Sequence, residues 1–212
     1  MINLHLVRHG HTIWSDTGGV AGRTDIDLSD KGRASVNALA TTIHHEFMAT
    51  HWFCSPMKRT RQTADIIRSV FESAHSYTLP ELVFDKRLME LDFGDWEGQT
   101  WDEVHQNTPD ILANWGEDWV NRSPPNGETF NEQCNRCQSW LNEWLSSVQH
   151  ESDAAATVIS HGGSIRALIC LCLGWDLSDA MTFNVDPASH CWLQCENPQG
   201  PWQIKAINSQ RF

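Results

Sequence analysis

The chain has 212 residues, a length typical of one domain, and its 40% hydrophobic and 20% charged content is that of a globular protein. The formal net charge of -12 disfavours general binding to nucleic acid, and no run of basic residues overrides it. The apolar runs are too short for a membrane span, and the first ten residues lack the pattern of a signal peptide. We therefore expect a cytoplasmic protein that binds neither nucleic acid nor membrane.

Strands and helices alternate in the first part of the chain. Residues 2–7 are an apolar run that predicts a buried strand, and 27–47 predict a helix that begins at Ser29 or Asp30. A second strand is expected at 51–54, followed by another helix. The apolar faces of these helices are Val36, Leu39, Ala40, Ile43 and Phe47 in the first, and Ala64, Ile67 and Phe71 in the second.

The alternation resumes after a polar, tryptophan-rich middle segment. A long helix is expected at about 128–148, a β-branched strand at 156–160 and a helix at 164–173. Two more strands are expected near 182–196 and 202–207. This order predicts an α/β fold, a three-layer α/β/α sandwich with a mostly parallel central sheet, formed by the whole chain as a single domain.

Polar groups follow three of the predicted strands. RHG (8–10) follows the first strand, KRTR (58–61) lies close behind the second, and HGG (161–163) follows the strand at 156–160. The carboxyl ends of parallel strands meet at one edge of a sheet, where such sheets bind ligands. If the three strands are neighbours, these groups converge on one site.

Two histidines and at least two arginines around one point suit a dianion such as phosphate. Gly10 and Gly162, beside the histidines, would let backbone N–H groups approach it closely. A histidine there could donate a hydrogen bond to phosphate, or its neutral ring nitrogen could attack phosphorus. An acid would then have to protonate the departing oxygen, and Glu90, Asp92 and Glu97 are alternatives.

Four motifs resemble the successive signatures of the histidine phosphatase (phosphoglycerate mutase-like) superfamily. They are VRHG at 7–10, CSPMKRTRQTA at 54–64, LMELDFGDWEG at 88–98 and VISHGG at 158–163. The resemblance implies a phosphomonoester hydrolase whose partner is a small phosphorylated metabolite. We expect no metal and no cofactor, because the chain lacks a metal-ligand motif and the arginines and histidines can neutralise phosphate. The oligomeric state is left open.

The resemblance also implies a role for individual residues. His9 is the nucleophile that becomes phosphorylated, and Glu90, three residues before the FG dipeptide, is the general acid. Arg8, Arg59 and His161 bind the phosphate. These five residues are the candidate catalytic set.

Other positions are weaker candidates for substrate contact. Gly162 follows the second histidine, and Ser15 stands where the family often has an asparagine that contacts phosphate. Arg23 either reaches the substrate or is a surface arginine. His11 stands where the family often has glutamate, and we assign it no role.

Later segments resemble the α-ribazole phosphatases within this superfamily. They are FGDWEG, NWGEDWVNRSPPNGETF, MTFNVDPASHCWL and IKAINS. The resemblance implies removal of the 5′-phosphate of α-ribazole 5′-phosphate in cobalamin biosynthesis. A broad-specificity phosphatase and a mutase-like enzyme are alternatives, although the insertion lacks a basic cluster beyond Arg122 that a mutase would need.

The segment at about 95–130 is expected to be a cap or lid insertion. Its tryptophans could stack on a flat base of the substrate, or could pack the cap against the sheet. They are Trp96, Trp101, Trp115 and Trp119.

Two other classes of protein would use part of the same residues or a pair of cysteines. A noncatalytic phosphoester-binding module would need the arginines and His161 but not Glu90. Cys134 and Cys137 form a CxxC, which suits zinc or thiol redox chemistry. Both cysteines fall on the apolar stripe of the long helix, so we expect buried structural thiols.

Overall fold

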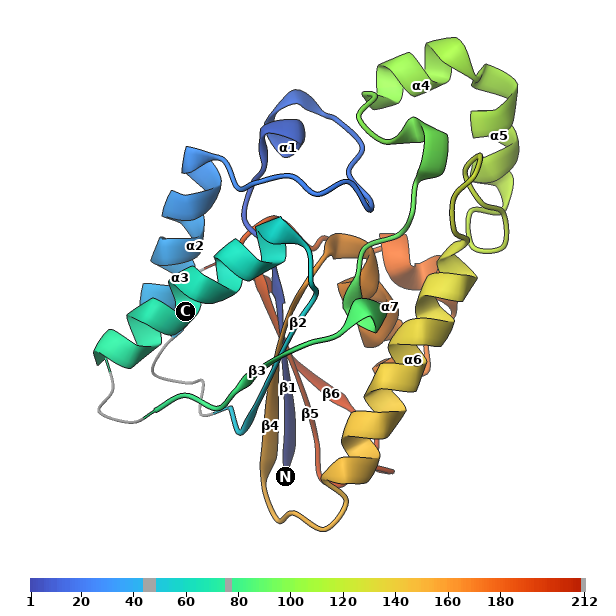
Figure 1. The fold of residues 1–212 in the computed structure, drawn as a ribbon. Coiled ribbons are helices and arrows are strands. Elements are labelled where there is room, and N and C mark those ends of the chain that lie inside the picture. The colour runs from blue at the N-terminus through green and yellow to red at the C-terminus, as the bar shows by residue number, and fades with distance from the viewer. Residues whose placement is uncertain (44–48, 75–77, 211–212) are drawn as a thin grey trace.

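A six-stranded mixed sheet forms the centre of the protein (Figure 1), whose computed structural model describes residues 1–43, 49–74 and 78–210. The strands are β1 (Ile2–Arg8), β2 (His51–Cys54), β3 (Leu82–Phe84), β4 (Ala154–Ser160), β5 (His190–Cys195) and β6 (Gln203–Ser209). Their order is β3-β2-β4-β1-β5-β6. The first four run parallel, and β5 pairs antiparallel with both β1 and β6. The predicted α/β fold with a mostly parallel sheet is confirmed.

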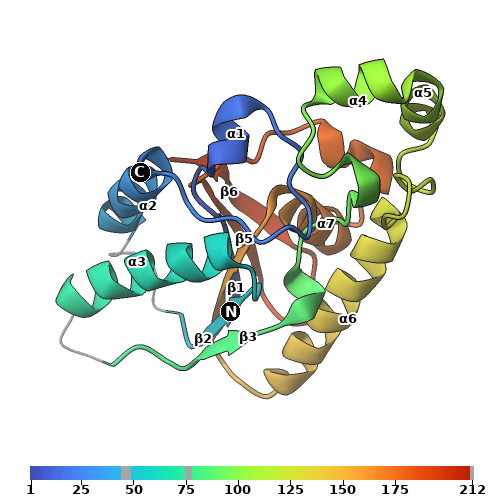
Figure 2. The same cartoon turned by 45° about the horizontal axis from the view of Figure 1, so that its top comes forward.

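Helices cover both faces of the sheet. α2 (Asp30–Ile43) and α3 (Lys58–Ala74) lie on one face, and α6 (Phe130–Ser147) and α7 (Gly162–Leu173) lie on the other (Figure 2). Ser29 caps α2, because its hydroxyl accepts a hydrogen bond from Gly32 N at 3.2 Å. The three-layer arrangement is therefore confirmed.

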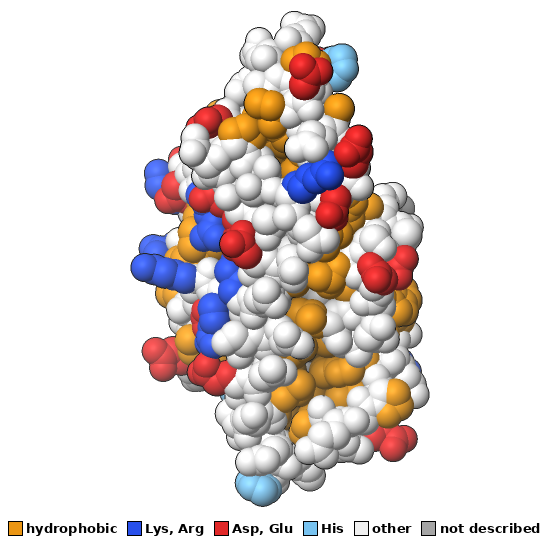
Figure 3. All heavy atoms as spheres, turned by 90° about the vertical axis from the view of Figure 1, so that its right-hand side faces the viewer, with side chains coloured by type: hydrophobic (Ala, Val, Ile, Leu, Met, Phe, Trp, Pro, Cys, Tyr) orange, Lys and Arg blue, Asp and Glu red, His pale blue; other side chains and the backbone are white. Residues whose placement is uncertain are grey.

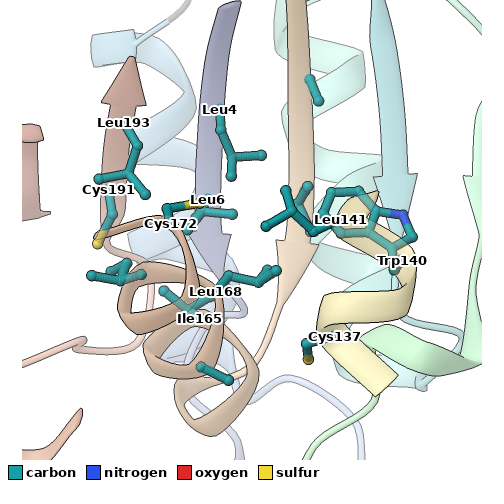
Figure 4. Close-up of a cluster of buried hydrophobic side chains, with 14 of the residues drawn as sticks. Leu4, Leu6, Cys137, Trp140, Leu141, Ile165, Leu168, Cys172, Cys191 and Leu193 are labelled. Carbon is teal, nitrogen blue, oxygen red and sulfur yellow. The ribbon is translucent and has the colours of Figure 1, made fainter. Parts of the chain in front are cut away.

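Each face of the sheet has its own hydrophobic core. The predicted inner faces of α2 and α3 are buried in one core, except Phe47, which lies outside the described residues. In the other core, Leu4 and Leu6 of β1 pack beneath α6 and α7 (Figure 4). Adjacent residues of β1 and β4 point to opposite faces, so both strands are buried on both sides.

The CxxC cysteines belong to this second core. Cys134 and Cys137 are 2% and 0% exposed, and burial raises the pKa of Cys137 to about 12. All seven cysteines of the chain are buried free thiols. A structural role for the pair therefore accounts for its place in the fold.

Several elements differ from the sequence prediction. β3 and the helices α1 (Ile13–Thr17), α4 (Trp101–Asn107) and α5 (Pro109–Glu117) were not predicted. The same holds for the 3₁₀ turns η1 (Lys86–Leu88), η2 (Gly94–Trp96) and η3 (Leu177–Met181).

The strand predicted at 182–196 is wrong in its first half, because β5 begins only at His190. Pro187 has no N–H to donate to a strand ladder, and Ala188 has a φ of 53°. The carbonyl of Val185 instead accepts a hydrogen bond from the guanidinium of Arg8. This irregular segment therefore binds the end of β1.

The surface carries mixed charge on the face that Figure 3 shows. Lys and Arg side chains stand beside Asp and Glu side chains there, with hydrophobic side chains between them. On that face the described residues form no broad basic surface. In the described part of the chain, no helix is both long and apolar enough to cross a membrane.

Candidate active site

Three strand ends meet at one edge of the sheet. β4 lies between β2 and β1, and all three are parallel. The N–H of His9 donates to the carbonyl of Ser160 at 3.0 Å, and the N–H of Ser55 donates to that of Ile159 at 3.0 Å. The segments that follow the three strands therefore begin side by side, as the sequence predicted.

His9 presents an unprotonated ring nitrogen. Its Nδ1 lies 2.7 Å from the carbonyl oxygen of Gly10, which can only accept, so Nδ1 carries the proton and Nε2 does not. Burial, followed by the positive charges of Arg59 and Arg8, lowers the pKa of His9 well below 6.5. The ring is therefore neutral at neutral pH, with Nε2 available as a nucleophile.

His161 packs edge-on against His9, with ring centroids 5.2 Å apart. Arg59 Nε donates to its Nδ1 at 3.2 Å, so Nε2 carries the proton and donates to the hydroxyl of Ser55 at 2.8 Å. Burial, then the charge of Arg59, lowers the pKa of His161 well below 6.5. Both nitrogens thus bind protein groups here, and direct contact of His161 with phosphate stays a prediction.

The two predicted phosphate-binding arginines differ in their surroundings. Arg59 is fully buried, and besides His161 it donates to the carbonyls of Gly22 at 2.6 Å and Thr24 at 3.0 Å. Arg8 Nη1 donates to Val185 O at 2.5 Å, while its buried Nε has no hydrogen-bond partner in the described part of the chain. Arg8 therefore keeps donors for an anion above His9.

Glu90 lies at the same site and is 8% exposed. Its two oxygens accept hydrogen bonds from the N–H of Gly163 at 3.1 and 3.2 Å, and Oε1 accepts another from the N–H of Leu91 at 3.0 Å. A side chain at position 163 would overlap Glu90 Oε1, so this contact requires glycine.

The rival carboxylates have structural partners. Asp92 Oδ1 accepts from Gly94 N at 2.9 Å within a turn. Glu97 accepts from the backbone N–H groups of Arg23 at 2.6 Å and Thr24 at 2.7 Å. Among the described residues that line the cavity, Glu90 is present and these two are absent.

Gly10 and Gly162 serve different purposes. A Cβ at Gly10 would lie 2.7 Å from Gly32 O, and Gly10 N already donates to Thr63 Oγ1 at 3.2 Å. Gly10 thus allows α2 to approach closely, which differs from the expected approach to an anion. A Cβ at Gly162 would lie 3.1 Å from Arg166 Nη1 and 3.4 Å from Arg8 Cζ, so Gly162 lies beside two guanidinium groups.

A cavity of about 320 Å³ opens above His9. Its polar residues include Arg8, His9, Glu90, Gln133, Gly162, Gly163 and Arg166. Its aromatic residues are Phe93, Trp101, Trp115, Trp119 and Phe130. His9, Arg8 and Glu90 therefore share one space with several aromatic side chains, whereas Arg59 and His161 are absent from the described cavity wall.

Ser15, Arg23 and His11 have weaker connections to the cavity. Ser15 lines the cavity, but its hydroxyl accepts a hydrogen bond from Thr12 N at 2.8 Å and so completes the capping box of α1, whose N-cap is Thr12. Arg23 donates to Glu128 Oε2 at 3.2 Å and is absent from the described cavity wall. His11 is also absent from that wall, and its Nδ1 lies 3.4 Å from Asp16 Oδ1.

Sequence reasoning missed three polar residues of the cavity, which are Thr12, Arg166 and Gln133. Arg166 comes four residues after Gly162, so the two share one face of α7. Gln133 comes three residues after Phe130 and four before Cys137, on the apolar stripe of α6. A polar residue on such a stripe is a signal that could have identified it.

No group of three or more His, Cys, Asp or Glu is arranged to hold a metal ion within residues 1–43, 49–74 and 78–210. The expected mechanism without metal stays a prediction.

We expect the free energy of unfolding to fall as the pH drops from 6.5 to 5. Burial lowers the pKa of His5 to about 3, and holds those of His9, His161 and His190 well below 6.5. In the unfolded chain these histidines titrate near 6.5, so below that pH the unfolded state binds more protons. Each would cost up to about 1.4 kcal/mol per pH unit. Urea unfolding curves at several pH values test this, and a constant unfolding free energy over that range would contradict it.

Comparison with known proteins identifies the family of the chain. The sequence model of the histidine phosphatase superfamily (branch 1) matches residues 4–210. Phosphoserine phosphatase 1 of Hydrogenobacter thermophilus is 31% identical over 92% of this chain and 88% of its own length. The adenosylcobalamin/alpha-ribazole phosphatase of Salmonella typhimurium is 28% identical over 99% of this chain and 97% of its own.

Solved structures share the whole fold. The crystal structure of the alpha-ribazole phosphatase from Shigella flexneri superposes with a TM-score of 0.84 at 25% identity, covering 99% of this chain and 97% of that one. The chain therefore belongs to the histidine phosphatase superfamily, branch 1, and is a hydrolase of that superfamily.

Proposed function

We propose that the protein hydrolyses phosphomonoesters in two steps through a phosphohistidine on His9. The observation that carries the proposal is the contact of His9 Nδ1 with the Gly10 carbonyl, which leaves Nε2 without a proton in the neutral ring, in the same cavity as Arg8 and Glu90. Arg8 and Gly162, which line this cavity, are proposed phosphate-binding groups. Arg59 and His161 are absent from its described wall and bind protein groups, so their contact with phosphate is proposed on the family resemblance alone.

In the first step, Nε2 of His9 attacks phosphorus and the bond from phosphorus to the leaving oxygen breaks. Glu90, in its protonated form, gives its proton to that oxygen. The arginine guanidiniums stabilise the negative charge on the transferred group.

In the second step, the carboxylate of Glu90 takes a proton from water. The water oxygen attacks phosphorus, and the bond between phosphorus and Nε2 breaks. Inorganic phosphate leaves, His9 is neutral again and Glu90 is again protonated.

For the substrate we propose α-ribazole 5′-phosphate, on the strength of the aromatic wall. Trp101 and Trp115 stack with ring centroids 6.0 Å apart, and both line the cavity. Trp96 is 1% exposed and packs edge-on against both, which anchors them. Such a surface suits the flat base of α-ribazole. The name of the Salmonella relative includes alpha-ribazole.

We also propose that the segment at 95–130 is a cap on a single catalytic domain. α4 and α5 project beyond the edge of the sheet at which the strand ends meet (Figures 1 and 2). Trp101 of α4 and Trp115 of α5 reach the cavity. Both roles expected of the tryptophans then apply, because Trp96 packs the cap while Trp101, Trp115 and Trp119 line the ligand space.

A second candidate substrate is phosphoserine, and Arg166 favours it. Arg166 lines the cavity beside Gly162, and its buried Nε has no hydrogen-bond partner in the described part of the chain. No carboxylate forms an ion pair with it there. A half-buried guanidinium in this position suits a carboxylate on the leaving group. The relative in Hydrogenobacter is a phosphoserine phosphatase.

A substrate panel separates these candidates. We expect α-ribazole 5′-phosphate to exceed phosphoserine, phosphoglycerates, sugar phosphates and nucleotides in kcat/KM by about a hundredfold or more. Phosphoserine and phosphoethanolamine differ only in the carboxylate. If the wild type has a higher kcat/KM for phosphoserine than for phosphoethanolamine, and Arg166→Met abolishes that difference, the second candidate is right. A flat profile would indicate a broad-specificity phosphatase.

We place the protein in the cytoplasm, where thiols stay reduced. The seven buried free cysteines support this location.

A further inference from the structure

Glu90 receives a side-chain hydrogen bond from Gln133, a fully buried residue of α6 that lines the cavity. Nε2 of Gln133 lies 3.1 Å from Glu90 Oε1 and 2.9 Å from the hydroxyl of Ser164. We propose that Gln133 is a positioning residue: by binding one oxygen of the Glu90 carboxyl group, it determines which oxygen exchanges protons with the substrate. This inference rests on the proposed role of Glu90 as general acid.

The orientation of the Gln133 amide follows from its neighbours. The hydroxyl of Ser164 donates to the carbonyl of Met89 at 2.8 Å, so it can only accept from Gln133. The NH₂ group of Gln133 therefore faces both Ser164 and Glu90. Its two hydrogens serve these two partners, and a reversed amide would place its oxygen against the carboxylate.

The contacts make the two oxygens of Glu90 unequal. Oε1 accepts hydrogen bonds from Leu91 N, Gly163 N and Gln133 Nε2, at 3.0 to 3.1 Å. Oε2 accepts one hydrogen bond in the described part of the chain, from Gly163 N at 3.2 Å. A proton on Oε1 would point at groups that are themselves donors. The acid proton therefore belongs on Oε2, and Gln133 keeps Oε1 turned away from the reaction.

Packing alone does not explain a glutamine at this position. Gln133 lies on the apolar stripe with Phe130, Cys134 and Cys137, where an apolar side chain would avoid desolvation of the amide. Its Oε1 is buried with no hydrogen-bond partner among the described residues. That cost is offset only by what the amide nitrogen does for Glu90 and Ser164.

The test compares two leaving groups in Gln133→Met, which keeps the size of the side chain but removes the donor. An alkyl leaving group needs a proton from the acid, whereas p-nitrophenolate leaves without one. We expect kcat/KM for glycerol 3-phosphate to fall about tenfold, and that for p-nitrophenyl phosphate to change by less than about twofold. Because the two values come from one preparation, partial misfolding cancels in their ratio. An equal fall for both substrates would overturn the proposal.

A double variant shows whether Gln133 acts through Glu90. In a Glu90→Gln background, Gln133→Met should cause no further loss on glycerol 3-phosphate. Additive losses would mean a structural role. Cys134→Ala, at a buried position on α6 with no hydrogen bond to Glu90 in the described part of the chain, is the matched control and should leave the substrate ratio unchanged. If Glu90→Gln itself shows no loss specific to the alkyl ester, the proposed function fails. If Glu90→Gln shows that specific loss and Gln133→Met does not, only the inference about Gln133 fails.

Discussion

Replacement of His9 by alanine is expected to lower kcat by roughly 10⁴-fold or more on every phosphomonoester. The imidazole Nε2 is the atom that bonds to phosphorus in the proposed reaction, and no other histidine among the described residues lines the cavity. His161 cannot replace it, because both of its nitrogens are held by Arg59 and Ser55. Steady-state hydrolysis of p-nitrophenyl phosphate measures the loss.

The neighbouring histidine provides a matched control. His11 is absent from the cavity wall as described, and His11→Ala should keep kcat within about threefold of wild type. Thermal unfolding should show that both variants are folded. A His9→Ala protein that retains a tenth of the activity would contradict the nucleophile assignment.

Replacement of Glu90 by glutamine is expected to lower kcat/KM for alkyl phosphates by about 10²- to 10⁴-fold. Glutamine keeps the shape of the side chain but cannot transfer a proton. The loss should be much smaller for p-nitrophenyl phosphate, whose leaving group needs no acid. Parallel measurement of glycerol 3-phosphate and p-nitrophenyl phosphate shows the difference.

Asp92 tests whether the effect is specific to one carboxylate. Asp92→Asn retains the Oδ1 atom that accepts from Gly94 N, so its turn should persist. We expect the activity of this variant on both substrates to stay within about threefold of wild type. If Asp92→Asn lost as much as Glu90→Gln, the acid would have been assigned to the wrong residue.

The convergence of His9, Arg59 and His161 was predictable because it depends on strand order and direction. Alternation of strands with helices indicates a parallel sheet, and the polar motifs directly follow the strands. Once β4 lies between β1 and β2, the two histidines must be close. The sequence therefore predicted the convergence on the condition that the three strands are neighbours, and the observed strand order meets that condition.

Other features depend on contacts that a linear pattern does not show. β3 has only three residues, too few to show a periodicity. Residues 182–189 are partly apolar, but they form no strand because Pro187 has no N–H and the carbonyl of Val185 accepts a hydrogen bond from Arg8. The helices α4 and α5 were missed although Thr100 forms a capping box with Glu103 and Pro109 begins α5. Capping signals were present there, but the polar composition obscured them.

The side-chain partners within the site were the least predictable part. Arg23 was a candidate for substrate binding, yet its charge is paired with Glu128. Arg166 and Gln133 line the cavity although they were not predicted to do so. Their helices were predicted correctly, but the rotation of each helix about its axis decides which polar residue faces the cavity. The sequence supports the reaction class, whereas the proposals for the leaving group rest on the residues of α4, α5 and α7 that line the cavity.

The most direct test of the account is a search for the phosphohistidine itself. Rapid quenching of wild-type enzyme with radiolabelled p-nitrophenyl phosphate should give a protein adduct that is stable in base and lost in acid, and peptide mapping should place it on His9. The same label should be absent from His9→Ala. Absence of any adduct during turnover by the wild type, or a label on another residue, would contradict covalent catalysis by His9.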